Sequence, residues 1–247
     1  MKVIAKRLIH HLGFNICVQP LYPSDLDQES VDIIRRVKPY TMTSTERLFS
    51  LIQAVRYVLK TNIPGDIVEC GVWRGGSMMA VAYTLKQLEV CDRDLYLFDT
   101  FEGMTRPTND DIDFQDQPAS KRFERSQRSN NSSEWCHVSI EDVQRNLFTT
   151  EYSKERIKFI KGRVEDTIPD SAPGKISILR LDTDWFESTR HELTHLYPRL
   201  SRGGVLIIDD YGHWQGCRKA TDEYFAQHNI SILLNRIDYT GRIAVKS

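Results

Sequence analysis

The chain has 247 residues, 40% of them hydrophobic, so it is long enough for one large domain with a substantial core. The formal net charge is −1 and no long basic run occurs, so nucleic-acid binding is not expected. No stretch is long and apolar enough to predict a membrane-spanning helix. The five cysteines contain no Cys-x-x-Cys pair, which favours reduced thiols in a cytoplasmic protein.

Residues 1–38 are expected to form an N-terminal extension before a single domain over residues 39–247. Within the extension, residues 25–37 are a candidate helix. Apolar residues near its start need a partner surface, so we expect the extension to act as a lid or to join copies in a homo-oligomer. These residues are Val3, Ile4, Leu8, Ile9, Leu12 and Phe14.

A helix is predicted after the extension, because apolar residues recur at helical spacing between Leu48 and Val58. Thr43 and Glu46 have the spacing of a capping box, which would start this helix. The helix should end near residues 62–64 and lead into the first strand.

Residues 65–76 predict a buried strand, a tight turn and the start of a second helix. Gly71 allows the turn, and Gly75 allows a close approach by a ligand or by another backbone segment. Such a junction binds nucleotide-like cofactors at the carboxyl end of its strand. The pattern is Glu-x-Gly-x-x-x-Gly, and the Glu69 carboxylate would repel a pyrophosphate but suits the sulfonium and ammonium groups of S-adenosylmethionine. A strand–turn–helix unit without a ligand is the alternative.

The second strand is predicted at residues 95–99 and ends in Asp99. In a doubly wound sheet an acid at this place binds ribose hydroxyls, although a solvated strand end is also possible. Residues 105–136 are polar and irregular, so we expect them to form a lid over the pocket of the acceptor, the substrate that would receive a group from the cofactor. Asp166 follows a further strand, where it could recognise an adenine amino group.

The rest of the chain alternates strands and helices and ends in a hairpin, which predicts an α/β fold with a mainly parallel sheet and one reversed strand. Strands are expected at residues 157–160, 176–182 and 205–210, the last after a turn at Gly203 and Gly204. Helices are expected at 188–200 and 217–228, and the hairpin strands at 230–234 and 242–245.

Two of these strands end in acids, Asp182 with Asp184 and Asp209 with Asp210. If the strands are neighbours, four carboxylates converge, and a divalent cation would relieve their repulsion. Ligands that are all oxygen favour magnesium or calcium over zinc. The alternative is that each Asp caps a loop or helix. A metal beside a methyl donor suggests methylation of a hydroxyl, with a free carboxylate as base. His213 could be catalytic or could only line the acceptor site.

The sequence resembles the macrocin O-methyltransferase family from about Tyr40 to the C-terminus. The resemblance is carried by five motifs: Thr41-Met42-Thr43-Ser44, Val68-Glu69-Cys70-Gly71-Val72-Trp73-Arg74-Gly75-Gly76, Phe98-Asp99-Thr100-Phe101-Glu102-Gly103-Met104, Leu181-Asp182-Thr183-Asp184 and Ile208-Asp209-Asp210-Tyr211. Members of this family are class I, Rossmann-like enzymes that use S-adenosylmethionine and magnesium to methylate sugar hydroxyls on macrolides and related natural products, including antibiotics.

The resemblance implies a role for each matched residue. Asp182, Asp209 and Asp210 would hold magnesium, and Asp184 would be the general base. The cofactor contacts would be Thr41, Met42, Glu69, Gly71, Arg74, Gly75, Ser77, Asp99, Asp166 and Asp182. Trp185 is expected to border the acceptor, which leaves open an acceptor other than a macrolide sugar.

Three functions therefore remain as hypotheses. The first is a magnesium-dependent O-methyltransferase for a small hydroxylated acceptor, either a sugar-bearing natural product or a phenol or catechol. The second is a nicotinamide-dependent oxidoreductase, against which Glu69 and the missing Gly-x-Gly-x-x-Gly pattern argue. The third is a non-catalytic module with the same fold, which would be expected to lose its acids.

Overall fold

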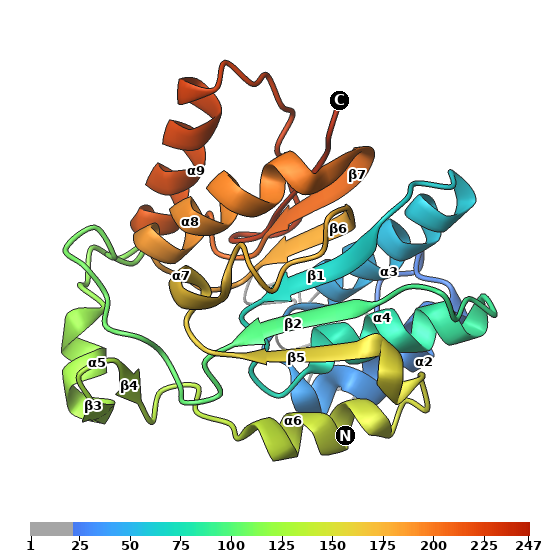
Figure 1. Cartoon of the computed structure of the whole chain (residues 1–247), viewed down its shortest axis with the longest axis horizontal. Helices are drawn as coiled ribbons and strands as arrows, with labels where there is room; N and C mark the ends of the chain where they lie inside the picture. Colours follow the sequence, from blue (N-terminus) through green and yellow to red (C-terminus); the bar gives the residue numbers. More distant parts are fainter. Residues whose placement is uncertain (1–21) are drawn as a thin grey trace, which may run out of the picture.

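The computed structural model describes residues 22–247, which form a seven-stranded sheet with helices on both faces (Figure 1). The strand order is β5-β2-β1-β6-β7-β9-β8. The parallel strands are β1 (Asp66–Cys70), β2 (Leu95–Asp99), β5 (Ile157–Lys161), β6 (Ile176–Leu181) and β7 (Leu200–Ile208). Strand β9 (Arg242–Val245) runs antiparallel to β7 and to β8 (Asn235–Arg236), so the predicted mainly parallel sheet with one reversed strand is confirmed.

Two layers of helices cover the sheet because its strands are apolar on both faces. In β1, Ile67 belongs to one core cluster, whereas Val68 and Cys70 belong to the other. One layer contains α2 (Gln28–Val37), α3 (Thr45–Lys60), α4 (Gly76–Gln87) and α6 (Ile140–Phe148), and the other contains α7 (Val164–Thr167), α8 (Phe186–Leu196) and α9 (Gln215–Gln227). Short 3₁₀ turns are η1 (Lys38–Tyr40), η2 (Lys154–Arg156) and η3 (Tyr197–Arg199).

The part of the N-terminal extension that the structure describes packs into the core of the domain. Helix α2 begins with Asp27 as its cap and packs against α3 and α4, and its residues Ile33, Ile34 and Val37 are buried in the core. The apolar residues at positions 3–14 lie outside the described residues. The contact between copies that they suggest therefore stays a prediction.

Two local expectations were wrong for reasons that the contacts explain. Helix α3 is capped by Ser44, whose hydroxyl accepts from Arg47 N, because the Thr43 hydroxyl is turned inward to accept from Arg180. Gly203 lies within β7 and not in a turn before it, because its N–H donates to Lys246 O and thereby extends the pairing with the C-terminal strand.

The final hairpin is shorter than the sequence suggested. Residues 230–234 form no strand, although three of their side chains pack on the second core cluster. Strand β8 pairs with β9 through Asn235 and Arg236 alone. The segment 230–234 therefore has the apolar pattern of a strand, but it does not pair with a neighbouring strand through backbone hydrogen bonds.

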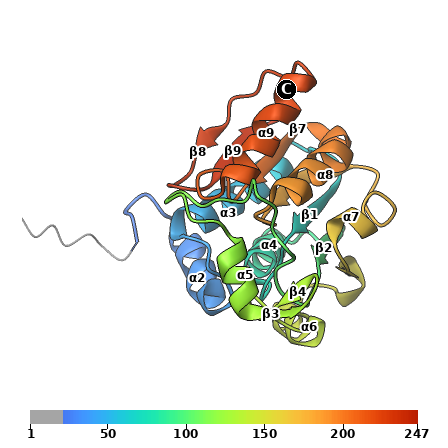
Figure 2. The ribbon, with the colours of Figure 1, turned by 90° about the vertical axis from the view of Figure 1, so that its left-hand side faces the viewer.

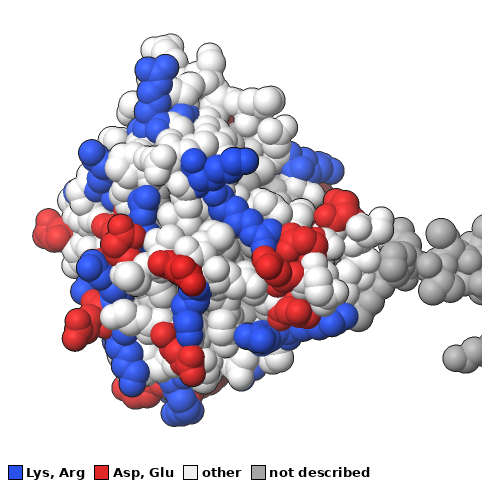
Figure 3. Space-filling view, turned by 90° about the vertical axis from the view of Figure 1, so that its right-hand side faces the viewer, with Lys and Arg blue, Asp and Glu red and all other residues white. Residues whose placement is uncertain are grey.

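The lid region also has short elements of its own: α5 (Ser120–Ser126), β3 (Gln127–Ser129) and β4 (Ser132–Ser133). They lie at the side of the molecule to which the parallel strands point (Figure 2). At the opposite side, positive and negative side chains are interspersed over the surface (Figure 3). Among the described residues, no helix has the length and hydropathy needed to cross a membrane.

Candidate active site

A cleft of about 290 Å³ lies beyond the carboxyl ends of the central strands. Its walls come from the segment between η1 and α3, the turn after β1, the lid and the turn between β8 and β9. Six of the ten residues expected at a cofactor line it: Thr41, Met42, Gly71, Ser77, Asp99 and Asp182. The ends of β6 and β7 form its base. The topology therefore places the cleft where open α/β sheets bind ligands.

The turn after β1 depends on glycine at position 71. Gly71 has φ +83°, and a Cβ there would lie 1.9 Å from the Asp182 carbonyl oxygen, so no other residue allows these two strand ends to pass. Asp99, at the end of β2, accepts from Val72 N at 2.6 Å and from Phe101 N at 2.7 Å. Asp99 lines the cleft and at the same time fixes the turns that border it.

Four residues expected at the cofactor are not among those that line this cleft, and three of them are Gly75, Arg74 and Asp166. Gly75 has φ +88°, and a Cβ there would meet the Leu147 side chain at 2.4 Å, so this glycine serves packing of the turn against α6. The Arg74 guanidinium donates to Pro39 O. Asp166 is exposed on α7, whereas the preceding Glu165 lines a smaller hollow beside Asp99.

Glu69 also lies outside the cleft lining, contrary to the expectation that it faces a cofactor cation. It is a register partner of Arg180 on β6, and the Glu69 carboxylate accepts from that guanidinium at 2.6 Å. Its Oε2 is buried, without a hydrogen-bond partner among the described residues. Burial raises the pKa of Glu69 to about 7, although Arg180 acts to lower it. Glu69 thus belongs to a charged cluster beneath the cleft.

Arg180 connects this cluster to the acids at the strand ends. One of its nitrogens lies 2.8 Å from Asp182 Oδ2, and the other donates to Asp209 Oδ1 at 2.7 Å. Arg47 of α3 binds the second oxygen of Asp209 and donates to Asp238 at 2.9 Å. Sequence reasoning missed both arginines. The available signal was one arginine within the otherwise apolar run Ile178-Leu179-Arg180-Leu181.

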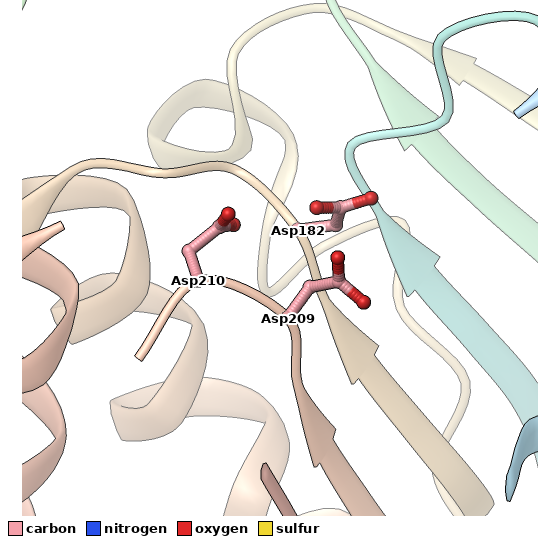
Figure 4. A group of neighbouring side chains, drawn as sticks. All are labelled: Asp182, Asp209 and Asp210. Atoms are coloured by element: carbon pink, nitrogen blue, oxygen red, sulfur yellow. The ribbon is translucent and has the colours of Figure 1, made fainter. Parts of the chain in front are cut away.

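Asp182, Asp209 and Asp210 project from the ends of β6 and β7 toward the same space (Figure 4). Each offers a carboxylate oxygen, and these three atoms lie within 4.8 Å of one another. Burial, followed by repulsion from neighbouring carboxylates, raises the pKa of Asp210 well above its usual range. Asp210 Oδ2 is buried without a hydrogen-bond partner among the described residues. An oxygen-only set with an unpaired buried carboxylate oxygen fits magnesium.

Asp184 lies in the cleft beside these acids but outside the group of three. Its backbone has φ +69°, a left-handed conformation that is uncommon for a residue with a side chain. Trp214 Nε1 donates to Asp184 Oδ1 at 2.6 Å. Burial and the Asp182 charge raise the pKa of Asp184 to about 8. We call Asp182, Asp184, Asp209 and Asp210 the carboxylate floor of the cleft.

Three ring-bearing side chains from distant segments meet at the edge of the cleft, and we call Phe114, His213 and Tyr239 the aromatic mouth. The ring of Phe114 lies 5.1 Å from that of His213 and 5.9 Å from that of Tyr239. Phe114 and Tyr239 are 53% and 56% exposed. Burial lowers the pKa of His213, so its ring is neutral at pH 7, and its Nδ1 lies 3.1 Å from the Tyr239 hydroxyl.

The lid contributes three lining residues that the sequence did not single out, Arg122, Trp135 and Cys136. The Arg122 guanidinium lies over the Trp135 ring at 4.1 Å. Burial, then the Asp184 charge, raises the pKa of Cys136 to about 12, so its thiol stays protonated. Trp185 does not border the cleft as expected. It is 3% exposed and packs in the core between the lid and α9.

A comparison with protein families matches residues 21–245 to the model described as macrocin-O-methyltransferase (TylF). The match begins before Tyr40, where the motifs alone placed the start of the resemblance. The chain is 37% identical to demethyldecarbamoylnovobiocin O-methyltransferase of Streptomyces niveus over 202 residues, which are 82% of this chain and 74% of that protein. It is 36% identical to mycinamicin III 3''-O-methyltransferase of Micromonospora griseorubida, over 82% and 76% of the two chains.

Solved structures agree with this likeness. The O-methyltransferase NovP superposes with a TM-score of 0.74 at 30% identity, over 100% of this chain and 97% of that one. The calicheamicin methyltransferase CalS11 gives a TM-score of 0.61 at 17% identity, over 94% and 98% of the two chains, and so shares the fold. These neighbours establish that the mainly parallel sheet is that of the class I methyltransferases.

Proposed function

The chain belongs to the macrocin O-methyltransferase family and is an O-methyltransferase, and we propose that it transfers the methyl group of S-adenosylmethionine to a sugar hydroxyl of a glycosylated natural product with the help of magnesium. The observation that carries the proposal is the carboxylate floor: three convergent carboxylates with Asp184 beside them, in the same cleft as the turn after β1.

The chain supplies binding groups on two sides of the cleft. In the proposal the methyl donor lies along the turn after β1, where Gly71, Ser77 and Asp99 face the cleft together with Thr41 and Met42. The acceptor lies toward the lid and the aromatic mouth. The two groups then meet above the carboxylate floor.

The reaction forms a bond from the acceptor oxygen to the methyl carbon and breaks the bond from that carbon to sulfur, so the hydroxyl must lose its proton. Asp184 takes this proton, because it lies in the cleft and outside the group of three carboxylates, and a cation held by that group would offset the Asp182 charge that raises the pKa of Asp184. A magnesium ion held by Asp182, Asp209 and Asp210 would supply a Lewis acid that lowers the pKa of the hydroxyl. Arg180 holds two of these carboxylates in place from below.

The acceptor class rests on the relatives and on the mouth. One relative, 35% identical, is named for the 4'-oxygen of a rhamnosyl-tetracenomycin, a sugar on a larger scaffold. In this chain Phe114 and Tyr239 of the aromatic mouth are large, exposed and close to the cleft. We propose that they contact the scaffold while the sugar reaches the carboxylate floor, which favours a glycoside over a simple phenol or catechol.

Methyl transfer to a panel of rhamnosides and phenols, with methyl-labelled cofactor, tests the proposal. Mass spectrometry should find one added methyl group on a glycoside when magnesium is present, and none after chelation by EDTA. Restored turnover on adding magnesium back is the control for irreversible damage by the chelator. Full turnover in EDTA would remove the metal from the proposal, and methylation of the phenols alone would overturn the acceptor class.

Assembly and location are the remaining parts of the proposal. We expect a homo-oligomer, because the apolar residues at positions 3–14 need a partner surface that a single domain does not supply. We also expect a cytoplasmic enzyme with reduced cysteines. Light scattering on the full chain and on a form without residues 1–21 measures the first expectation, and a monomer in both cases would refute it.

A further inference from the structure

Trp214 forms hydrogen bonds with two of the four acidic residues of the carboxylate floor. Its Nε1 donates to Asp184 Oδ1 at 2.6 Å, which is short for a bond of this kind. Its backbone N–H donates to Asp210 O at 3.0 Å. One residue therefore holds the side chain of Asp184 and is itself anchored to Asp210 of the group of three carboxylates.

The ring of Trp214 is held on several sides. It is 6% exposed, and its centroid lies 5.0 Å from that of Trp185 and 6.1 Å from that of Trp135. Its backbone also forms an isolated antiparallel bridge with Asp113 of the lid. Little rotation of this indole is possible without moving the lid or α8.

The backbone of Asp184 does little to fix the direction of its side chain, so another residue must hold the carboxylate. It follows the end of β6 in a left-handed conformation, so strand pairing does not fix its side chain. An indole N–H that binds one carboxylate oxygen sets the rotation of the whole carboxylate, and thereby the direction of the other oxygen.

We propose that Trp214 is a positioning residue for the general base: its indole N–H aims the Asp184 carboxylate at the acceptor hydroxyl. The inference rests on the proposed function, because it needs Asp184 to be the base. It makes Trp214 a part of the methyl-transfer step and not only a part of the core.

Trp185 provides a matched control within the same cluster. It is 3% exposed, and its Nε1 donates to Thr105 O at 3.1 Å, a bond of the same chemistry that does not reach Asp184. Its ring packs against both Trp135 and Trp214. A purely structural role predicts the same consequences for Trp214→Phe and Trp185→Phe.

The first measurement is a ¹H–¹⁵N spectrum of the indole N–H groups of the full chain, which has four tryptophans. Trp→Phe variants assign the signals. We expect the Trp214 signal to lie downfield, as a short bond to a carboxylate requires, and to move upfield in Asp184→Ala while the Trp185 signal stays. A Trp214 signal that does not respond to Asp184→Ala overturns the proposal without reference to activity.

The second measurement is the steady-state kinetics of Trp214→Phe with saturating cofactor and magnesium. Loss of a hydrogen bond to a charged group predicts a fall in kcat of about ten- to a hundredfold, with KM and cofactor affinity within about twofold. Trp185→Phe should keep kcat within about threefold. Equal losses in the two variants would reduce Trp214 to a packing residue.

Phenylalanine is smaller than tryptophan, so a second replacement separates the N–H from the volume. The exchange Trp214→3-benzothienylalanine keeps a bicyclic ring but leaves no N–H to donate. We expect it to lose as much of kcat as Trp214→Phe, and full activity would overturn the proposal. If Asp184→Asn keeps full turnover, the assignment of Asp184 as the base fails, and with it the mechanism in the proposed function. If Asp184→Asn is inactive but Trp214→Phe is fully active, the base assignment stands and only the positioning role of Trp214 is overturned.

Discussion

The carboxylate floor and the aromatic mouth belong to one cleft but are built in opposite ways. The acids of the floor follow strands β6 and β7, and buried groups hold them from below, chiefly Arg180. The mouth comes from three loops, and two of its three rings, Phe114 and Tyr239, are more than half exposed.

The difference separates the chemistry from the choice of acceptor. Buried strand ends hold groups in fixed directions, as metal binding and proton transfer require. Loops on a rigid scaffold can change without disturbing the core, so they suit recognition of the variable part of a substrate. Changes to the floor should therefore alter kcat, metal requirement or stability, whereas changes to the mouth should alter KM.

The largest effect is expected from Asp184→Asn. Removal of a general base should lower kcat by about a hundred- to ten-thousandfold, because the amide cannot take the acceptor proton. Cofactor affinity by calorimetry and the magnesium requirement should change little, which distinguishes the base from a ligand. A magnesium requirement that rises as steeply as in Asp182→Asn would make Asp184 a metal ligand instead.

Asp182→Asn should act on the metal. It removes one negative charge from the group of three, so the magnesium concentration for half-maximal activity should rise at least about tenfold. Saturating magnesium should restore part of kcat. Isothermal calorimetry with magnesium measures binding independently of turnover, and unchanged affinity there would break the assignment of the group as a metal site.

Glu69→Ala tests the support beneath the floor. It leaves a buried face of Arg180 without its partner, so we expect a loss of about 1.5 to 3 kcal/mol in the free energy of unfolding. Urea denaturation measures this loss. Glu134→Ala is the control, because Glu134 is 65% exposed in its pair with Arg128 and should change stability by less than about 1 kcal/mol. Equal losses in the free energy of unfolding for the two variants would mean that the buried ion pair stabilises the fold no more than an exposed one.

The smallest effect is expected at the mouth. Phe114→Ala and Tyr239→Ala should each raise KM for the acceptor by about two- to tenfold, since a stacking contact contributes about 0.5 to 1.5 kcal/mol. The value of kcat should change little. Tyr57→Ala removes another exposed ring, outside the cleft lining, and should change neither constant. A fall in kcat without a change in KM would place the mouth in the chemical step.

Local patterns were sufficient for most of the fold. The second strand at residues 95–99 and the last strand at 242–245 have the bounds that their composition predicted. The acids of the floor were visible as well, because each pair follows an apolar strand and parallel strands end at the same edge. The segment at 230–234 shows the limit, since an alternating pattern does not specify whether a neighbouring strand is available.

The amino-acid sequence was enough to show that two apolar strands each end in a pair of aspartates, because apolar spacing and the residues that follow it are properties of short segments. The contacts of those side chains, and the neighbourhood of the two strands, come from the packed fold. Glu69 faces Arg180 instead of the cleft, because the two are register partners on adjacent strands. Trp214 reaches Asp184 from thirty residues away. Contacts of this kind depend on how distant segments pack, and no local spacing encodes them.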